Sequence, residues 1–163
     1  MCLLPAAQFA YWKGLDCTDA LLNIYNHFQK SLDAEMEFYI FQLDFCSAFD
    51  RVSHSGLLFK LKSIGVGGRL LSICTEFLSD RRQTVVVDGA ASKWIPIISG
   101  VRQGSVLCPI LFILYTSKIF KLVENRLFAY TDDSTLLGVV HMLADRPAVA
   151  TSLNSDLARI QKW

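Results

Sequence analysis

Two adjacent aspartates, Asp132 and Asp133, interrupt an otherwise apolar stretch of the sequence. Residues 127–130 and 136–140 on either side are mostly aromatic, aliphatic or β-branched, which is typical of two strands joined by a tight turn. Adjacent carboxylates repel each other, so a folded chain rarely places them among apolar residues without a cation. The stretch alone leaves two interpretations open, a cation site or a solvated turn, because Asp is also a common turn residue.

A third acid, Asp44, stands near the C-terminal end of the apolar run 38–45. We interpret this run as a buried central strand. If the strand lies beside the Asp132-Asp133 hairpin, the three carboxylates converge into an all-oxygen cluster of the kind that suits Mg²⁺. Two such ions can activate an attacking hydroxyl and stabilise a leaving pyrophosphate, which is the chemistry of nucleotidyl transfer.

The elements that would position these acids predict an α+β fold, an antiparallel sheet with helices packed on one face. Apolar residues at helical spacing predict a helix from Thr18, capped by Thr18 or Asp16, and another over residues 148–163. The apolar face of the first comprises Leu21, Leu22, Tyr25, Phe28 and Leu32, and that of the second Val149, Leu153, Leu157 and Ile160. Two short helices over 55–64 and 69–78 and a β-hairpin over 84–98 lie between them.

A glycine-containing loop, residues 99–105, precedes a helix that opens near Pro109. Two glycines four residues apart allow the backbone to approach a ligand closely, and a helix N-terminus favours anions such as phosphate. Arg81 and Arg82 form a small basic spot that either contacts a phosphate backbone or belongs to a solvated loop.

Composition sets the limits of the function. The 163 residues suffice for one domain, and 52% hydrophobic and 19% charged residues indicate a globular chain. A net charge of +1 weighs against a complete nucleic-acid clamp. Five cysteines without a C-x-x-C pair indicate reduced thiols in an intracellular protein, nuclear or cytoplasmic. The longest apolar run, 109–115, is too short to span a membrane, and nothing in the sequence indicates an oligomeric state.

Four blocks in order resemble the palm of reverse transcriptases, in particular those of non-LTR (LINE-type) retrotransposons. They are residues 8–14 with 18–21, residues 43–54, residues 99–107 and residues 130–133. The resemblance implies an RNA-directed DNA polymerase that adds a dNTP to a primer on an RNA or DNA template. It also implies two Mg²⁺ ions, with Mn²⁺ as a substitute.

The resemblance implies a role for each matching residue. Asp44, Asp132 and Asp133 would be the catalytic metal ligands, helped by the carbonyl of Phe45. Phe49 would lie against the incoming sugar and exclude a ribose 2′-hydroxyl. Without the motif, Phe49 would be interpreted as a core phenylalanine. Further contacts would come from Gln103 and Gly104 to the nucleotide and template, and from Arg102, Arg81 and Arg82 to nucleic acid.

The resemblance also implies a partial domain: a pre-core segment (1–37), a palm (38–140) and the start of a following helical segment (141–163). We expect incomplete fingers and no thumb. The alternative is an inert, truncated remnant of a retrotransposon polymerase that at most binds nucleic acid weakly.

Two departures from the family pattern concern the backbone. Thr131 replaces the usual Ala and is small enough to fit, whereas Cys108 replaces a usual Gly and would be awkward at positive φ.

Overall fold

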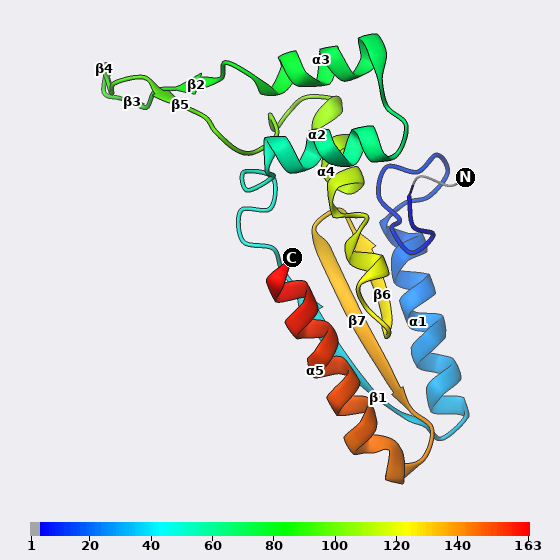
Figure 1. Cartoon of the computed structure of the whole chain (residues 1–163). Coiled ribbons are helices and arrows are strands. Elements are labelled where there is room, and N and C mark those ends of the chain that lie inside the picture. The colour runs from blue at the N-terminus through cyan, green and yellow to red at the C-terminus, as the bar shows by residue number, and fades with distance from the viewer. Residues whose placement is uncertain (1–3) are drawn as a thin grey trace. The chain divides into compact units, whose positions relative to one another are not determined.

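The computed structural model describes residues 4–163, whose elements are shown in Figure 1. The chain divides into two compact units, Met1–Cys46 with Thr116–Trp163 (unit 1) and Ser47–Tyr115 (unit 2). Between residues 4 and 163, none of the helices has the length and apolar character needed to cross a membrane.

Unit 1 is built on a three-stranded antiparallel sheet of order β1-β7-β6, formed by β1 (Glu37–Leu43), β6 (Arg126–Tyr130) and β7 (Asp133–Val140). The interpretation of residues 38–45 as a buried central strand is wrong, because β1 is an edge strand with mostly exposed side chains. The central strand is β7, which is buried along most of its length. An aromatic, aliphatic run is equally compatible with an edge strand, since composition does not say how many neighbours a strand has.

Helices cover both faces of this sheet, rather than the one face expected. Leu137 of β7 packs in a cluster with Ala20 of α1 (Cys17–Asp33), whereas its neighbour Leu136 packs in a cluster with Leu153 of α5 (Arg146–Lys162). Because successive strand residues point to opposite faces, α1 and α5 lie on opposite sides of the sheet (Figure 1).

The predicted apolar face of α5 is confirmed. Leu153 is buried, and Val149, Leu157 and Ile160 pack against the same cluster. Gly138 of β7 permits this close packing, since a Cβ there would lie only 2.7 Å from Leu153 Cδ1 and 3.0 Å from Val149 Cγ1.

The predicted face of α1 is wrong in most of its members. Asp16 caps the helix and forms a capping box with Asp19, as one of the two expected caps. The side that faces the sheet carries Ala20, Ile24 and Phe28, while four of the expected core residues are exposed: Leu21, Leu22, Tyr25 and Leu32. Two apolar stripes share this helix, and the sequence pattern alone does not distinguish the stripe that packs.

Unit 2 contains three helices and two short antiparallel ladders. The helices are α2 (His54–Ser63), α3 (Gly68–Leu78) and α4 (Leu107–Thr116), the last reaching one residue into unit 1. The hairpin expected over 84–98 begins two residues earlier. It consists of β2 (Arg82–Gln83) paired with β5 (Ile95–Pro96), and β3 (Val86–Val87) paired with β4 (Ala90–Ala91). Two 3₁₀ turns of unit 1, η1 (Ile119–Lys121) and η2 (Leu143–Asp145), complete the described elements.

Candidate active site

The acidic pair lies at the tip of the β6–β7 hairpin, as predicted. Tyr130 and Asp133 form the last paired position, so the loop consists of Thr131 and Asp132 alone. Thr131 has φ 61°, and a positive φ at the first of two loop residues is a position that glycine normally fills. A β-branched residue there is strained. Thr131, expected to be small enough to fit, therefore occupies this position under strain. Cys108 is helical within α4 and does not have the positive φ that would be awkward for it.

The register of the sheet brings Asp44 to the same tip. The last paired position between β1 and β7 joins Leu43 to Ser134. One step further along the antiparallel pair, Asp44 follows Leu43 and Asp133 precedes Ser134. Asp44 and Asp133 are exposed, Asp132 is half-buried, and all three belong to unit 1.

Phe45 anchors the chain directly after Asp44. Its half-buried ring packs against the cluster on the α5 side of the sheet, which includes Leu136 and Leu153. The anchored ring fixes the chain directly after Asp44 to the sheet. The Phe45 carbonyl lies in the same short segment.

The donor set at this tip consists of carboxylates and a carbonyl, the hard oxygen ligands that Mg²⁺ and Mn²⁺ prefer. The chemistry of these residues therefore fits a divalent ion. Within residues 4–163, the structure holds no group of three or more His, Cys, Asp or Glu side chains gathered closely enough to bind a metal.

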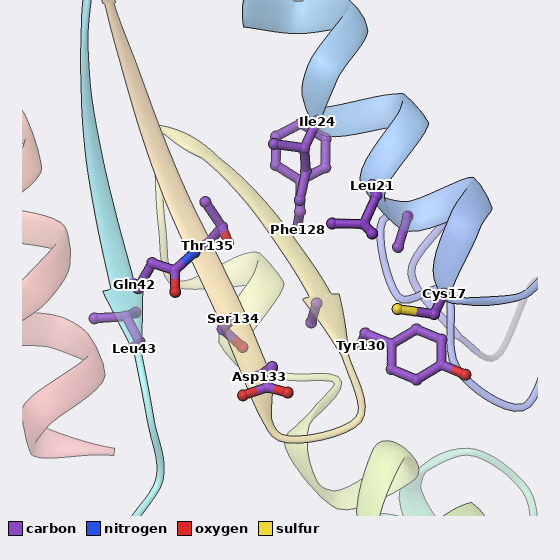
Figure 2. A pocket seen from close by; sticks show the side chains of 12 residues that line it. Cys17, Leu21, Ile24, Gln42, Leu43, Phe128, Tyr130, Asp133, Ser134 and Thr135 are labelled. Carbon is purple, nitrogen blue, oxygen red and sulfur yellow. The ribbon is translucent and has the colours of Figure 1, made fainter.

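A pocket of about 290 Å³ opens beside the acidic tip, between α1 and the sheet. Figure 2 shows Asp133 and Ser134 at the end nearest the hairpin turn, with the Tyr130 ring beside Cys17. Leu21 and Ile24 line the pocket from α1, and Phe128 lines it from β6. The site thus combines an apolar wall with a carboxylate at its mouth, a common composition for a ligand pocket.

In unit 2, the 99–105 loop is fastened to the turn that starts at Ser47. Gly100 N–H donates to the Val52 carbonyl at 2.8 Å, and Val101 N–H donates to the Phe49 carbonyl at 2.9 Å. Gly100 has φ 83°, and a Cβ there would lie 2.8 Å from the Asp50 carbonyl oxygen. The close backbone approach that these glycines allow is, at Gly100, an approach to the chain itself.

The predicted nucleotide contacts of unit 2 occupy this fastened region. Gln103 Nε2 donates to Asp50 Oδ1 at 3.3 Å, and Gly104 at φ 80° leaves open space where a Cβ would stand. The ring of Phe49 is half-buried, and its centre lies 4.5 Å from the centre of the Phe112 ring. Part of its surface is therefore used in packing.

Three arginines predicted to contact nucleic acid gather around one pocket of about 370 Å³. Arg81 Nη1 donates to the Gly100 carbonyl at 2.6 Å, and the Arg102 guanidinium lies 5.8 Å from the centre of the Phe77 ring. Arg82 lines the same pocket, together with Glu76 and Asp80, whose charges partly offset the positive field. The structure therefore brings Arg81, Arg82 and Arg102 together around one pocket.

The described site also contains Gln8, which the sequence marks only as part of a motif. It lies buried beside β6, where it forms a parallel bridge with Ala129. The signal in the sequence is a polar side chain among apolar neighbours, which in a folded chain needs hydrogen-bond partners.

The chain is similar to proteins of known family over most of its length. The family described as Reverse transcriptase (RNA-dependent DNA polymerase) matches residues 2–152. The RNA-directed DNA polymerase from mobile element jockey of Drosophila funebris is 33% identical over 168 residues, covering 98% of this chain and 18% of that protein. The jockey polymerase of Drosophila melanogaster is 38% identical over 116 residues, covering 71% of this chain and 12% of that protein. The chain thus spans less than a fifth of these relatives.

A solved structure shares the fold. The structure of apo telomerase from Candida tropicalis, truncated from the C-terminal domain, matches with a TM-score of 0.63 at 17% identity. The match covers 88% of this chain and 31% of that chain. It confirms the predicted α+β, palm-like arrangement of helices and antiparallel sheet.

Proposed function

The chain belongs to the reverse transcriptase (RNA-dependent DNA polymerase) family as a LINE-type domain, and from that premise we propose that it carries the catalytic palm of an RNA-directed DNA polymerase. The reaction joins a dNTP to the 3′-hydroxyl of a primer on an RNA or DNA template. One observation carries the proposal: the β1–β7 register brings Asp44 to the tip that holds Asp132 and Asp133.

Reverse transcriptases generally use divalent metals, and we assign the metal ligands to Asp44, Asp132 and Asp133 with the Phe45 carbonyl. When bound, two Mg²⁺ or Mn²⁺ ions supply charge that activates the primer hydroxyl and stabilises the leaving pyrophosphate. The chain's own part is to bring three carboxylates to one hairpin tip, where a bound cation would offset their mutual repulsion.

The residues of unit 2 receive the substrates in this proposal. Phe49 excludes a ribose 2′-hydroxyl by shape, and its packing on Phe112 keeps the ring in one place. Gln103 and Gly104 contact the nucleotide and the template backbone. The phosphates of the nucleic acid lie near Arg81, Arg82 and Arg102, whose shared pocket supports this assignment. We propose an intracellular location, in keeping with a sequence whose cysteines form no C-x-x-C pair, a pattern typical of reduced thiols.

Primer extension on an RNA template with Mg²⁺ tests the proposal. We expect incorporation by the unmodified chain and a loss on the order of 100-fold or more in Asp132→Asn, which removes a charge at the reacting centre. Asp33→Asn on the exposed end of α1 is the matched control and should extend the primer normally.

Two results would contradict the proposal in different ways. If the chain incorporates nothing while a longer polypeptide containing it does, the palm is not an independent enzyme. If neither extends a primer, yet the chain binds RNA, the inert nucleic-acid-binding remnant is the better description.

A further inference from the structure

The buried side chain of Gln8 is bonded to the turn that carries the acids. Gln8 is 1% exposed. Its Oε1 accepts hydrogen bonds from the Thr131 and Ala10 N–H groups, each at 3.1 Å. Its Nε2 donates to the Thr131 carbonyl at 3.3 Å. One side chain therefore engages both backbone polar groups of the strained turn residue.

The backbone around Gln8 is fixed to the strand that leads into the turn. Phe9 N–H donates to the Ala129 carbonyl, and Ala129 N–H donates to the Ala7 carbonyl, both at 2.9 Å. The backbone at Gln8 is therefore fixed beside the end of β6. From there its side chain extends to Thr131.

The amide group suits this position because it has both an acceptor and a donor. A peptide unit presents an N–H and a C=O, and the side-chain amide of Gln offers an acceptor and a donor on two neighbouring atoms without carrying a charge. Thr131 adopts φ 61°, a conformation that is unfavourable for a residue other than glycine and persists only when the surroundings enforce it. The Gln8 side chain, bonded to both the N–H and the carbonyl of Thr131, is placed to enforce it.

We propose that Gln8 is a positioning residue of the active site. By clamping Thr131 it fixes the turn, and thereby places Asp132 and Asp133 relative to Asp44. The inference rests on the proposed function, since its consequence is a metal site that loses affinity when the clamp is removed. Gln8 itself touches neither metal nor substrate.

The test compares Gln8→Ala and Gln8→Glu with the unmodified chain, using Gln29→Ala on the exposed side of α1 as the control. The first measurement is amide hydrogen exchange at Thr131 without metal or nucleic acid. We expect exchange to accelerate by about tenfold in Gln8→Ala, because the Thr131 N–H loses its hydrogen-bond acceptor. Gln8→Glu keeps the acceptor for the Thr131 N–H, so acceleration there should be smaller.

The second measurement is the Mg²⁺ concentration at the midpoint of the thermal shift. We expect it to rise by about tenfold in both Gln8 variants, as for other residues that orient metal ligands, and to stay unchanged in Gln29→Ala. Unchanged exchange at Thr131 would overturn the clamp. Faster exchange with an unchanged Mg²⁺ midpoint would overturn the positioning role.

A third variant separates positioning from general stability. Thr131→Gly needs no enforcement at positive φ, so adding it to Gln8→Glu should recover most of the lost Mg²⁺ affinity. If Gln8→Glu raises the Mg²⁺ midpoint by the same factor with and without Thr131→Gly, the proposal is overturned. If the unmodified chain shows no response to Mg²⁺, the proposed function fails, while exchange at Thr131 still decides whether Gln8 holds the turn.

Discussion

At the scale of single residues, Thr131 stores strain where the chemistry is proposed. Thr131→Gly should raise the free energy of unfolding by about 1 kcal/mol, since glycine adopts positive φ without the clash of a β-branched side chain. Chemical denaturation checks the change. Thr151→Gly, on an exposed position of the helix α5, should instead lower stability by a similar amount. Equal losses in both variants would show that the turn is unstrained.

A second residue, Asp156, is a fully buried acid with a structural role. Its carboxylate accepts hydrogen bonds from the backbone N–H groups of Glu124 at 3.0 Å and Asn125 at 2.8 Å, from Asn125 Nδ2 at 2.8 Å and from Arg159 at 3.1 Å. Burial opposes ionisation, but the Asn125 and Glu124 hydrogen bonds and the Arg159 charge outweigh it and lower the pKa of Asp156. The acid thus fixes the start of β6 to the helix α5.

This lowered pKa predicts how stability depends on pH. A carboxyl whose folded pKa lies below its unfolded value stabilises the fold above the unfolded pKa, near 4, and loses that contribution as pH falls through the folded pKa. Asp156→Asn should therefore cost about 2–3 kcal/mol at pH 7, because buried donors lose a charged acceptor, and should flatten the loss of stability in acid. Denaturation at pH 7 and pH 3 measures both effects. Asp33→Asn, which is exposed, should change neither, and an unchanged acid limb in Asp156→Asn would contradict the assignment.

At the scale of elements, the sequence predicts whether a segment is a helix or a strand better than it predicts which neighbours that element packs against. The periodic apolar residues were sufficient to predict the packed face of α5, and Asp16 was sufficient to predict the start of α1, because both are local signals. The edge position of β1 and the packed stripe of α1 depend on which distant elements exist to be packed against. For the candidate site, the acids could be predicted from residue type and order. The Gln8–Thr131 contact could not, since it joins residues 123 positions apart through one buried side chain.

The contact between β7 and α5 yields a prediction at this scale. Gly138→Ala should lower the free energy of unfolding by about 1–3 kcal/mol, because the new Cβ would lie 2.7 Å from Leu153, which is 1% exposed and has little room to move. Thermal and chemical denaturation measure the loss.

Matched variants identify the cause. Gly67→Ala, at a negative φ with open space around it, should cost much less. Leu153→Ala should be destabilising alone, yet combining it with Gly138→Ala should cost less than the sum of the two, because the clash disappears. Strict additivity would show that α5 does not rest on Gly138.

At the scale of the whole molecule, the acids and the arginines belong to different units, so their functions should be separable. Asp44→Asn relieves carboxylate repulsion, and we expect it to melt above the unmodified chain without metal. It should also lose the rise in melting temperature that Mg²⁺ produces by binding the folded state. Its affinity for single-stranded RNA should keep the same dependence on salt.

The double variant Arg82→Gln/Arg102→Gln should behave in the opposite way. Each lost phosphate contact reduces the slope of log affinity against log salt by about 0.7 for a single strand, so the slope should fall by about 1.4, while the Mg²⁺ response persists. Arg69→Gln, an exposed arginine outside the pocket, is the control and should leave both measurements near their original values. Binding titrations at several salt concentrations, paired with melting curves with and without Mg²⁺, give both readouts. If either set of substitutions changes both properties equally, metal and nucleic acid do not act through separate groups, because each would then depend on the fold as a whole.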